Sequence, residues 1–272
     1  MIKKILPIIL IVILVIVLLV VFLSRDKLNY NFSIYFFNAG KADAMIIKNN
    51  DKYIMIDTAE ESFTDEILNY FKINNITNLD YLIITHFDKD HVGGASSIIN
   101  NINVDKVLQS NYPKDSVYYD NYIEAIKNKN IKVLTIIDDY SFDLGDMKVI
   151  VNGPGKTYDK NESNNSSLIT KIYYKDNSFI FMGDAENARI KDFVSNNKET
   201  FDFIKIPYHG RKLKRMNELI DNTKPEYAVI TSGVDTNNID TINTLNNHQV
   251  KTYLTRNGDI YVYSDGVNIK VK

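Results

Sequence analysis

Cysteine and tryptophan are both absent from the chain, and only four of its 272 residues are histidine. The absence of cysteine excludes disulfide bonds, a lipoprotein anchor, thiolate metal ligands and a cysteine nucleophile, but it does not define the compartment. The formal net charge is only −2, so the composition gives no global signature of a nucleic-acid-binding protein. The chemistry of this chain has to be sought where its few histidines lie.

One long hydrophobic run is present, at the N-terminus. Residues 5–23 are an unbroken apolar stretch, long enough to cross the hydrocarbon core of a bilayer as a helix. The run ends in Val21-Phe22-Leu23-Ser24, without the small residues that precede a signal-peptidase cut. We therefore expect an uncleaved transmembrane signal anchor over residues 1–24 that contacts lipid through residues 5–23, followed by a polar linker over residues 25–31.

The charges beside this run say little about its orientation. Lys3 and Lys4 lie on one side, and Arg25 and Lys27 lie on the other, so the positive-inside rule barely decides. A short N-terminal tail usually stays in the cytoplasm. We therefore expect a single-pass protein of the cell membrane with its main domain outside the cell.

Residues 32–272 read as one α/β domain without internal repeats or a Pro- or Gly-rich linker. Short β-rich segments such as residues 32–38, 44–49 and 52–58 end at turn residues, and residues 61–74 have the apolar spacing of a helix. Strand and helix patterns then alternate to the end of the chain. This pattern predicts a sandwich of two sheets with helices outside.

The stretch THFDKDHVGG, residues 85–94, carries two histidines and two aspartates within six residues. His86, Asp88, Asp90 and His91 follow the apolar strand YLII, and imidazole and carboxylate groups are ligands for Zn²⁺ and Mn²⁺. The two glycines that follow supply the backbone freedom that a curled ligand loop needs. The alternative is a solvated acidic loop with incidental histidines.

Two other predicted strands end in the same kinds of side chain. Asp184 ends the strand in FIFMGDAE, and His209 ends the strand in FIKIPYHG. Either residue alone would more often be a cap or turn residue. Three such strand ends in one chain favour a metal centre over the solvated loop.

These motifs resemble the metallo-β-lactamase fold, and specifically its ComEC-like branch. The resemblance covers nearly all of the chain after about residue 32. The motif THFDKDHVGG matches T-H-x-D-x-D-H-x-G-G in every fixed position. In chain order, the segments that carry the resemblance are FFNAGKADAMII, YIMIDT, THFDKDHVGG, NNSSL, FMGDAE, PYHGRK and YLTRNGDI. The resemblance implies an αββα sandwich, here preceded by a transmembrane helix, that holds two divalent metal ions, Zn²⁺ or Mn²⁺.

The resemblance also implies roles for particular residues. The metal ligands would be His86 and Asp88 for one ion, Asp90, His91 and His209 for the other, and Asp184 as a bridge between them. The catalytic set would be Asp90, Asp184 and Asp57, the last orienting the ligand loop by hydrogen bonds. We expect the substrate-binding set to be Lys41, Asp43, Asn165, Ser167, Arg211 and Lys212. The usual third histidine of the first metal has no equivalent, and its place falls near residues 164–167.

The sequence departs from the family pattern beside one ligand. Tyr208 stands where the first of two neighbouring histidines is usual, and Arg211 replaces a serine. Arg211 begins a basic run, residues 211–215, directly after the ligand and its glycine. Arginine and lysine are suited to phosphate contact, so this run favours an anionic phosphodiester substrate.

The expected activity is that of a membrane-anchored, metal-dependent phosphodiesterase or nuclease, because two metal ions lower the pKa of a shared water. The ComEC-like relatives imply DNA as the substrate. One alternative is a cell-surface phosphodiesterase on phosphorylcholine or teichoic-acid polymers. Another is a non-catalytic metal-binding or binding module. The tyrosine-rich residues 111–122 do not separate these alternatives, and the sequence leaves the oligomeric state open.

Overall fold

The computed structural model describes residues 30–158 and 162–272, and residues Phe32–Lys272 form one compact unit. The predicted transmembrane anchor lies outside the described residues. Within the described ranges, no helix combines the length and the apolar character that a membrane span requires.

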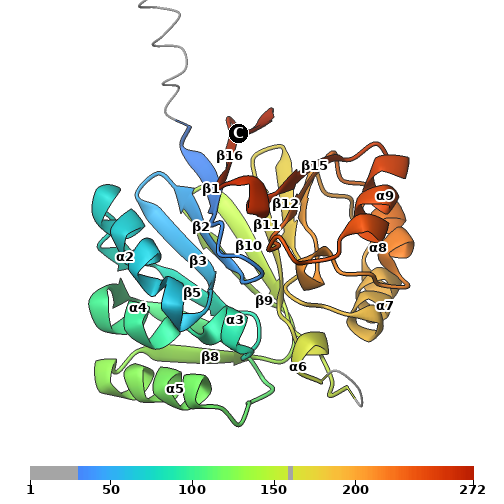
Figure 1. The fold of residues 1–272 in the computed structure, drawn as a ribbon. Helices are drawn as coiled ribbons and strands as arrows, with labels where there is room; N and C mark the ends of the chain where they lie inside the picture. The colour runs from blue at the N-terminus through green and yellow to red at the C-terminus, as the bar shows by residue number, and fades with distance from the viewer. Residues whose placement is uncertain (1–29, 159–161) are drawn as a thin grey trace, which may run out of the picture. The chain divides into compact units, whose positions relative to one another are not determined.

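The first sheet has eight strands and includes both ends of the compact unit (Figure 1). Its strand order is β17 (Ile269–Val271), β16 (Ile260–Ser264), β1 (Phe32–Phe36), β2 (Ala44–Asn49), β3 (Lys52–Thr58), β5 (Tyr81–Ile84), β7 (Lys106–Ser110) and β8 (Lys132–Ile136). The pairs from β3 to β8 are parallel, and those from β17 to β3 are antiparallel. The parallel strands therefore deliver their C-terminal ends to one edge of the sheet.

The second sheet has seven strands and is likewise mixed. Its strand order is β15 (Lys251–Leu254), β14 (Tyr227–Ile230), β13 (Phe203–Lys205), β12 (Asn177–Phe181), β11 (Ile169–Tyr174), β10 (Met147–Asn152) and β9 (Tyr140–Leu144). The pairs from β12 to β15 are parallel. A separate two-stranded ribbon joins β4 (Asn78–Leu79) to β6 (Asn103–Val104).

Helices cover the outer faces of both sheets (Figure 1). On the first sheet these are α2 (Thr64–Ile73), α4 (Ala95–Asn101) and α5 (Val117–Lys129), and on the second α7 (Asn187–Asn196), α8 (Met216–Thr223) and α9 (Ile239–Asn247). Short helical segments lie in the connections: η1 (Glu61–Phe63), α3 (Lys89–Val92), α6 (Glu162–Asn165), η2 (Tyr208–Gly210) and η3 (Thr255–Asn257).

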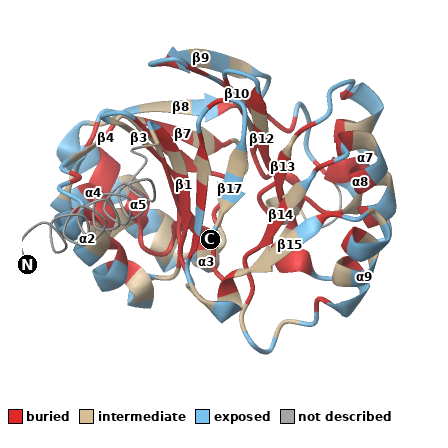
Figure 2. Cartoon of the chain, turned by 90° about the horizontal axis from the view of Figure 1, so that it is seen from above, coloured by how far each residue is buried: buried red, intermediate tan, exposed pale blue. Residues whose placement is uncertain are grey.

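Three apolar cores hold these layers together. One core lies between the sheets, with Phe36, Phe181 and Phe203 among its members, and one lies under the helices of each sheet. Figure 2 shows the buried residues concentrated on the strands and on the helix faces that pack against them. This arrangement confirms the predicted αββα sandwich.

Several element boundaries differ from the sequence-based expectation. The β-rich residues 142–151 divide into β9 and β10, joined by a turn in which Gly145 has a φ of +63°. The strand expected over residues 203–209 ends at Lys205. Proline follows at position 207, and Tyr208 and His209 both adopt a φ of +51°, a left-handed conformation that no strand can continue.

Candidate metal centre

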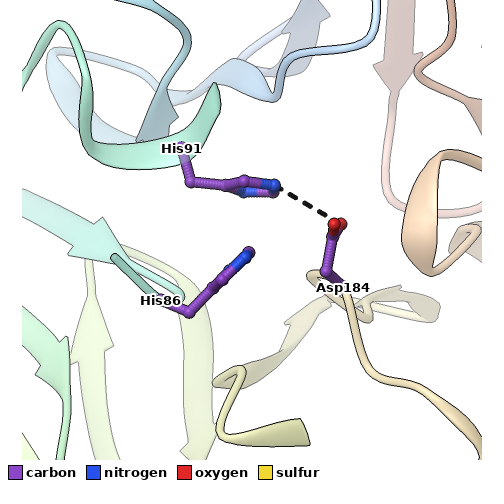
Figure 3. Close-up of side chains that lie close together, drawn as sticks. All are labelled: His86, His91 and Asp184. Atoms are coloured by element: carbon purple, nitrogen blue, oxygen red, sulfur yellow. Dashed lines mark ion pairs between the residues drawn. The ribbon is translucent and has the colours of Figure 1, made fainter. Parts of the chain in front are cut away.

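The six candidate ligands come from three connections that meet at the C-terminal ends of parallel strands. His86 and Asp88 follow β5, and Asp90 and His91 lie in the short helix α3. Asp184 follows β12 and His209 follows β13. Figure 3 shows the side chains of His86, His91 and Asp184 pointing toward one another. The structure therefore brings together groups from both sheets.

Asp184 stands between two histidines. Its Oδ1 lies 3.4 Å from His91 Nε2, and its Oδ2 lies 3.1 Å from His209 Nε2. His209 Nε2 also lies 3.5 Å from Asp90 Oδ2. In the first loop, His86 Nε2 lies 3.9 Å from Asp88 Oδ1. Donor atoms about 2.1 Å from a shared ion in a tetrahedral arrangement lie ~3.4 Å apart. The observed separations are of this size.

The donor atoms at the centre of this cluster have no hydrogen-bond partner. Within the described residues, His86 Nε2, His91 Nε2, Asp184 Oδ1 and His209 Nε2 are buried and make no hydrogen bond, although His91 and His209 lie at ion-pair distance from Asp184. Buried polar atoms are nearly always paired, so unpaired nitrogen and oxygen donors that converge on one place fit a metal ion. Two groups of three residues have candidate ligand atoms within 4.8 Å of one another. One group is His86, His91 and Asp184, and the other is Asp90, His91 and His209.

Asp57 orients His91 from behind. Its Oδ2 lies 2.8 Å from His91 Nδ1, and its carboxylate accepts hydrogen bonds from Thr85 N at 2.8 Å and Thr85 Oγ1 at 2.7 Å. Because Nδ1 is engaged by Asp57, the Nε2 atom of His91 faces the centre. A carboxylate behind a histidine ligand fixes its tautomer and ring orientation.

Asp43 orients the ring of His209 from behind. Asp43 itself is held by Lys205, a residue that the sequence analysis did not single out. Both Asp43 and Lys205 are wholly buried. The Lys205 ammonium donates to Asp43 Oδ2 and, at 3.3 Å, to the carbonyl of Gly183, while Asp43 Oδ1 lies 3.4 Å from His209 Nδ1. Asp43 was predicted to contact substrate; in this structure it is wholly buried behind His209, and contact with substrate stays a prediction. The sequence does carry a signal for this residue, because Lys205 is a charged side chain within the apolar segment FIKIP.

Asn165 and Ser167 were also predicted to contact substrate. Both side chains are buried in the structure, and their contact with substrate stays a prediction. Ser167 Oγ accepts a hydrogen bond from the backbone N–H of Asp184 at 3.1 Å and lies 3.4 Å from His86 Nδ1. Asn165 Oδ1 accepts from the backbone N–H of Arg189. These side chains brace the ligand-bearing segments from within.

The basic residues expected to bind substrate are all exposed, but each lies differently. The guanidinium of Arg211 lies 5.3 Å from the ring centre of Tyr208. Lys212 pairs with Asp240 at 3.1 Å. Lys41 lines a cavity of about 400 Å³ together with Gly40, Gly233 and Arg256. The ammonium of Lys212 therefore lies against α9, which carries Asp240.

Burial and charge divide the histidines into two kinds. Burial lowers the pKa of His86 to about 4, and the nearby His91 lowers it as well. Burial also acts to lower the pKa of His91 and of His209, but the carboxylate of Asp184 raises both well above the usual value. His86 is therefore a neutral donor near pH 7, while His91 and His209 hold protons that a metal ion must displace.

The sandwich and its cluster of histidines and aspartates at the strand ends define a metal-dependent hydrolase of αββα fold. The chain belongs to the metallo-beta-lactamase superfamily, whose family model matches residues 38–233.

Two curated relatives confirm the resemblance to the ComEC-like branch. The chain is 26% identical over 174 residues, 61% of its length, to the ComE operon protein 3 of Bacillus subtilis. It is 27% identical over 202 residues, 72% of its length, to the Recombination protein 2 of Haemophilus influenzae. The matches span only 22% and 24% of those proteins.

Solved structures agree on the fold. The metallo-beta-lactamase fold protein YhfI from Bacillus subtilis superimposes with a TM-score of 0.58 at 9% identity, over 89% of this chain and 100% of that one.

Proposed function

We propose that this protein is a metal-dependent phosphodiesterase, with nuclease action on DNA as its first candidate activity. The observation that carries the proposal is the position of Asp184, whose two carboxylate oxygens face His91 and His209 across a cluster of unpaired buried donors. A carboxylate between two histidines suits a bridging ligand.

Each residue then has a defined task. His86 and Asp88 would hold one ion, and Asp90, His91 and His209 the other. Two divalent ions held there would lower the pKa of a bound water and would offset charge that develops on a phosphodiester. Asp57 and Asp43 keep the histidine rings of His91 and His209 turned toward the centre. The buried position of these carboxylates keeps water from competing for the rings.

Two features support a DNA substrate. Lys41 and Arg256 line a cavity beside the loop that carries Asp43, and such side chains bind phosphate groups. One curated relative is named for recombination, which is a process of DNA. We propose Zn²⁺ or Mn²⁺ as the metal, because the candidate ligand atoms are nitrogen and oxygen without sulfur.

We also propose that residues 5–23 anchor the protein in the cell membrane with the hydrolase domain outside the cell. The unbroken apolar character of this run supports the proposal. Protease added to intact cells should remove the domain, and full protection of the domain would contradict the proposed orientation.

The activity is tested with the full-length protein in detergent, stripped of metal and reloaded with Mn²⁺ or Zn²⁺. We expect metal-dependent cleavage of both bis-(p-nitrophenyl) phosphate and single-stranded DNA. Cleavage of the small diester alone would favour a cell-surface phosphodiesterase on phosphorylcholine or teichoic-acid polymers. An absence of both activities with every metal would favour a non-catalytic binding module.

A further inference from the structure

A lysine from a different part of the chain reaches one of the candidate ligands. Lys114, in the connection between β7 and α5, places its ammonium 2.5 Å from Asp88 Oδ1. The hydroxyl of Ser163, in α6, donates to the same oxygen. Both the Lys114 and the Asp88 side chains are about one-third exposed, at 36% and 29%. The ammonium is thus anchored at the ligand while remaining open to solvent.

This lysine also lines a cavity of about 400 Å³ that opens on Asp88. The other wall comes from α6, which contributes Glu162, Ser163 and Asn164. The hydroxyl of Tyr112 donates to the Glu162 carboxylate, and this bond ties the lysine-bearing connection to α6. The cavity therefore has two walls that are linked to each other, with a candidate ligand between them.

Two other lysines on or after the strand β13 are engaged differently. Lys205 is buried against Asp43, and Lys212 pairs with Asp240 on the surface. Lys114 is in ion-pair contact with a candidate ligand and faces open space at the same time. Among the residues that line this cavity, Lys114 is the cation, and the carboxylates of Asp88, Asp115 and Glu162 lie beside it.

We propose that Lys114 and the hydroxyl of Ser163 form an oxyanion subsite that holds a phosphate group of the substrate beside Asp88. The assignment of this subsite to substrate rests on the proposed phosphodiesterase function. Asp88 now balances the Lys114 charge. Once that carboxylate shares its charge with a divalent ion, the ammonium keeps positive charge for a phosphate oxygen, a charge-assisted hydrogen bond of the stronger kind. Lysine suits this task as a compact point charge.

Phosphate binding tests the subsite without turnover. Inorganic phosphate is titrated by calorimetry into the metal-loaded full-length protein and into its Lys114→Met variant, and metal content is measured on the same samples. We expect the affinity for phosphate to fall about 10- to 100-fold, the size of one lost charge-assisted bond, with metal content unchanged. Lys114→Arg should retain most of the affinity. Lys127→Met, which removes an exposed positive charge from α5, is the matched control.

Undiminished phosphate affinity in Lys114→Met would overturn the subsite. So would a loss of metal in that variant with normal phosphate affinity for each remaining metal-loaded molecule, because Lys114 would then only position Asp88. A wild type that binds phosphate through Lys114 but cleaves no diester would reject the proposed function and leave the oxyanion subsite standing. In an active protein, Lys114→Met should raise KM for bis-(p-nitrophenyl) phosphate far more than it lowers kcat.

Discussion

The two halves of the candidate metal centre are built in different ways. The first sheet contributes His86, Asp88, Asp90 and His91 from six consecutive residues, so this half is a local structure. The second sheet contributes Asp184 and His209 from separate strand ends, so this half exists only when β12 and β13 are paired. The comparison shows that one half depends on loop geometry and the other on tertiary packing.

The contacts that hold the ligands in place also differ between the two halves. In the first half, the loop is held by Asp57 and Thr85 and by two glycines that allow close backbone approach. In the second half, the left-handed His209 is fixed by Asn238, whose side chain donates to its carbonyl at 2.7 Å. Asp43 belongs to the connection before β2, and Lys205 belongs to β13, so their ion pair joins the two halves.

The largest effect is expected where the halves meet, at Asp184. The substitution Asp184→Asn removes the charge that faces both His91 and His209, so turnover should fall by more than the ~100-fold typical for the loss of a supporting partner. Cleavage of bis-(p-nitrophenyl) phosphate measures the effect. The control is Asp143→Asn, which changes an exposed aspartate on β9 and should leave turnover unchanged. Full activity in Asp184→Asn would contradict the bridging role.

The next largest effect concerns the ion pair between the halves. Lys205→Met removes the lysine partner of the buried Asp43 carboxylate and leaves Thr231 and His209 beside it. This should cost about 3–5 kcal/mol in the free energy of unfolding, measured by denaturant titration. The double substitution Asp43→Asn with Lys205→Met should recover most of this stability. It should still bind metal about 10- to 100-fold more weakly, because the support behind His209 is changed. Normal metal affinity in the double variant would show that the pair serves stability alone.

A smaller effect is expected from the first half alone. A Cβ atom at position 93 would lie 2.3 Å from the carbonyl oxygen of Lys89, so Gly93→Ala must shift the backbone of the ligand loop. We expect a loss of about 1–3 kcal/mol in unfolding free energy together with weaker metal binding. A Cβ at Gly233 would meet nothing closer than 3.4 Å, and Gly233→Ala is therefore the control. Equal behaviour of the two variants would contradict the tight packing of the loop.

The smallest effect is one of pH. The pKa values of His91 and His209 are raised in the folded protein. Their stabilisation of the metal-free protein is therefore complete below the unfolded histidine pKa of about 6.5 and is lost as pH rises through the folded values. Metal binding has the opposite sign, because it displaces these protons. The Tm of chelator-treated protein should fall from pH 6.5 to higher pH, while metal affinity rises. A metal affinity that is independent of pH in this window would contradict the protonation of both histidines.

The sequence predicted the local half of the centre more completely than the assembled half. The THFDKDHVGG loop is a continuous motif, and its ligands could be named from it. Asp184 and His209 were predicted as ligands because each follows an apolar strand. Lys114 was not found because it lies far from every candidate ligand in the sequence, and Lys205 was not found because a lysine within an apolar strand does not show which side chain it will meet. Their positions depend on how the connection before α5 and the strand β13 pack against distant segments.

The same reason explains why the burial of three predicted substrate-contact residues could not be read from the sequence. Asp43, Asn165 and Ser167 lie in motifs beside the ligands, and their polar character suggested contact with substrate. Only the packing of the second sheet against the first shows that all three are covered. Burial of a polar side chain is a tertiary property, so the sequence alone could not show that these three residues support the ligand-bearing segments.

The most direct test of the centre is the metal content of the purified full-length protein and of two variants, His91→Ala in the first half and His209→Ala in the second, measured by elemental analysis after dialysis. If the two halves form one centre, the wild type binds divalent metal and both variants lose most of it, although the substitutions lie on different sheets. A wild type without metal, or a His209→Ala variant that keeps the wild-type content, would contradict a centre shared by both sheets.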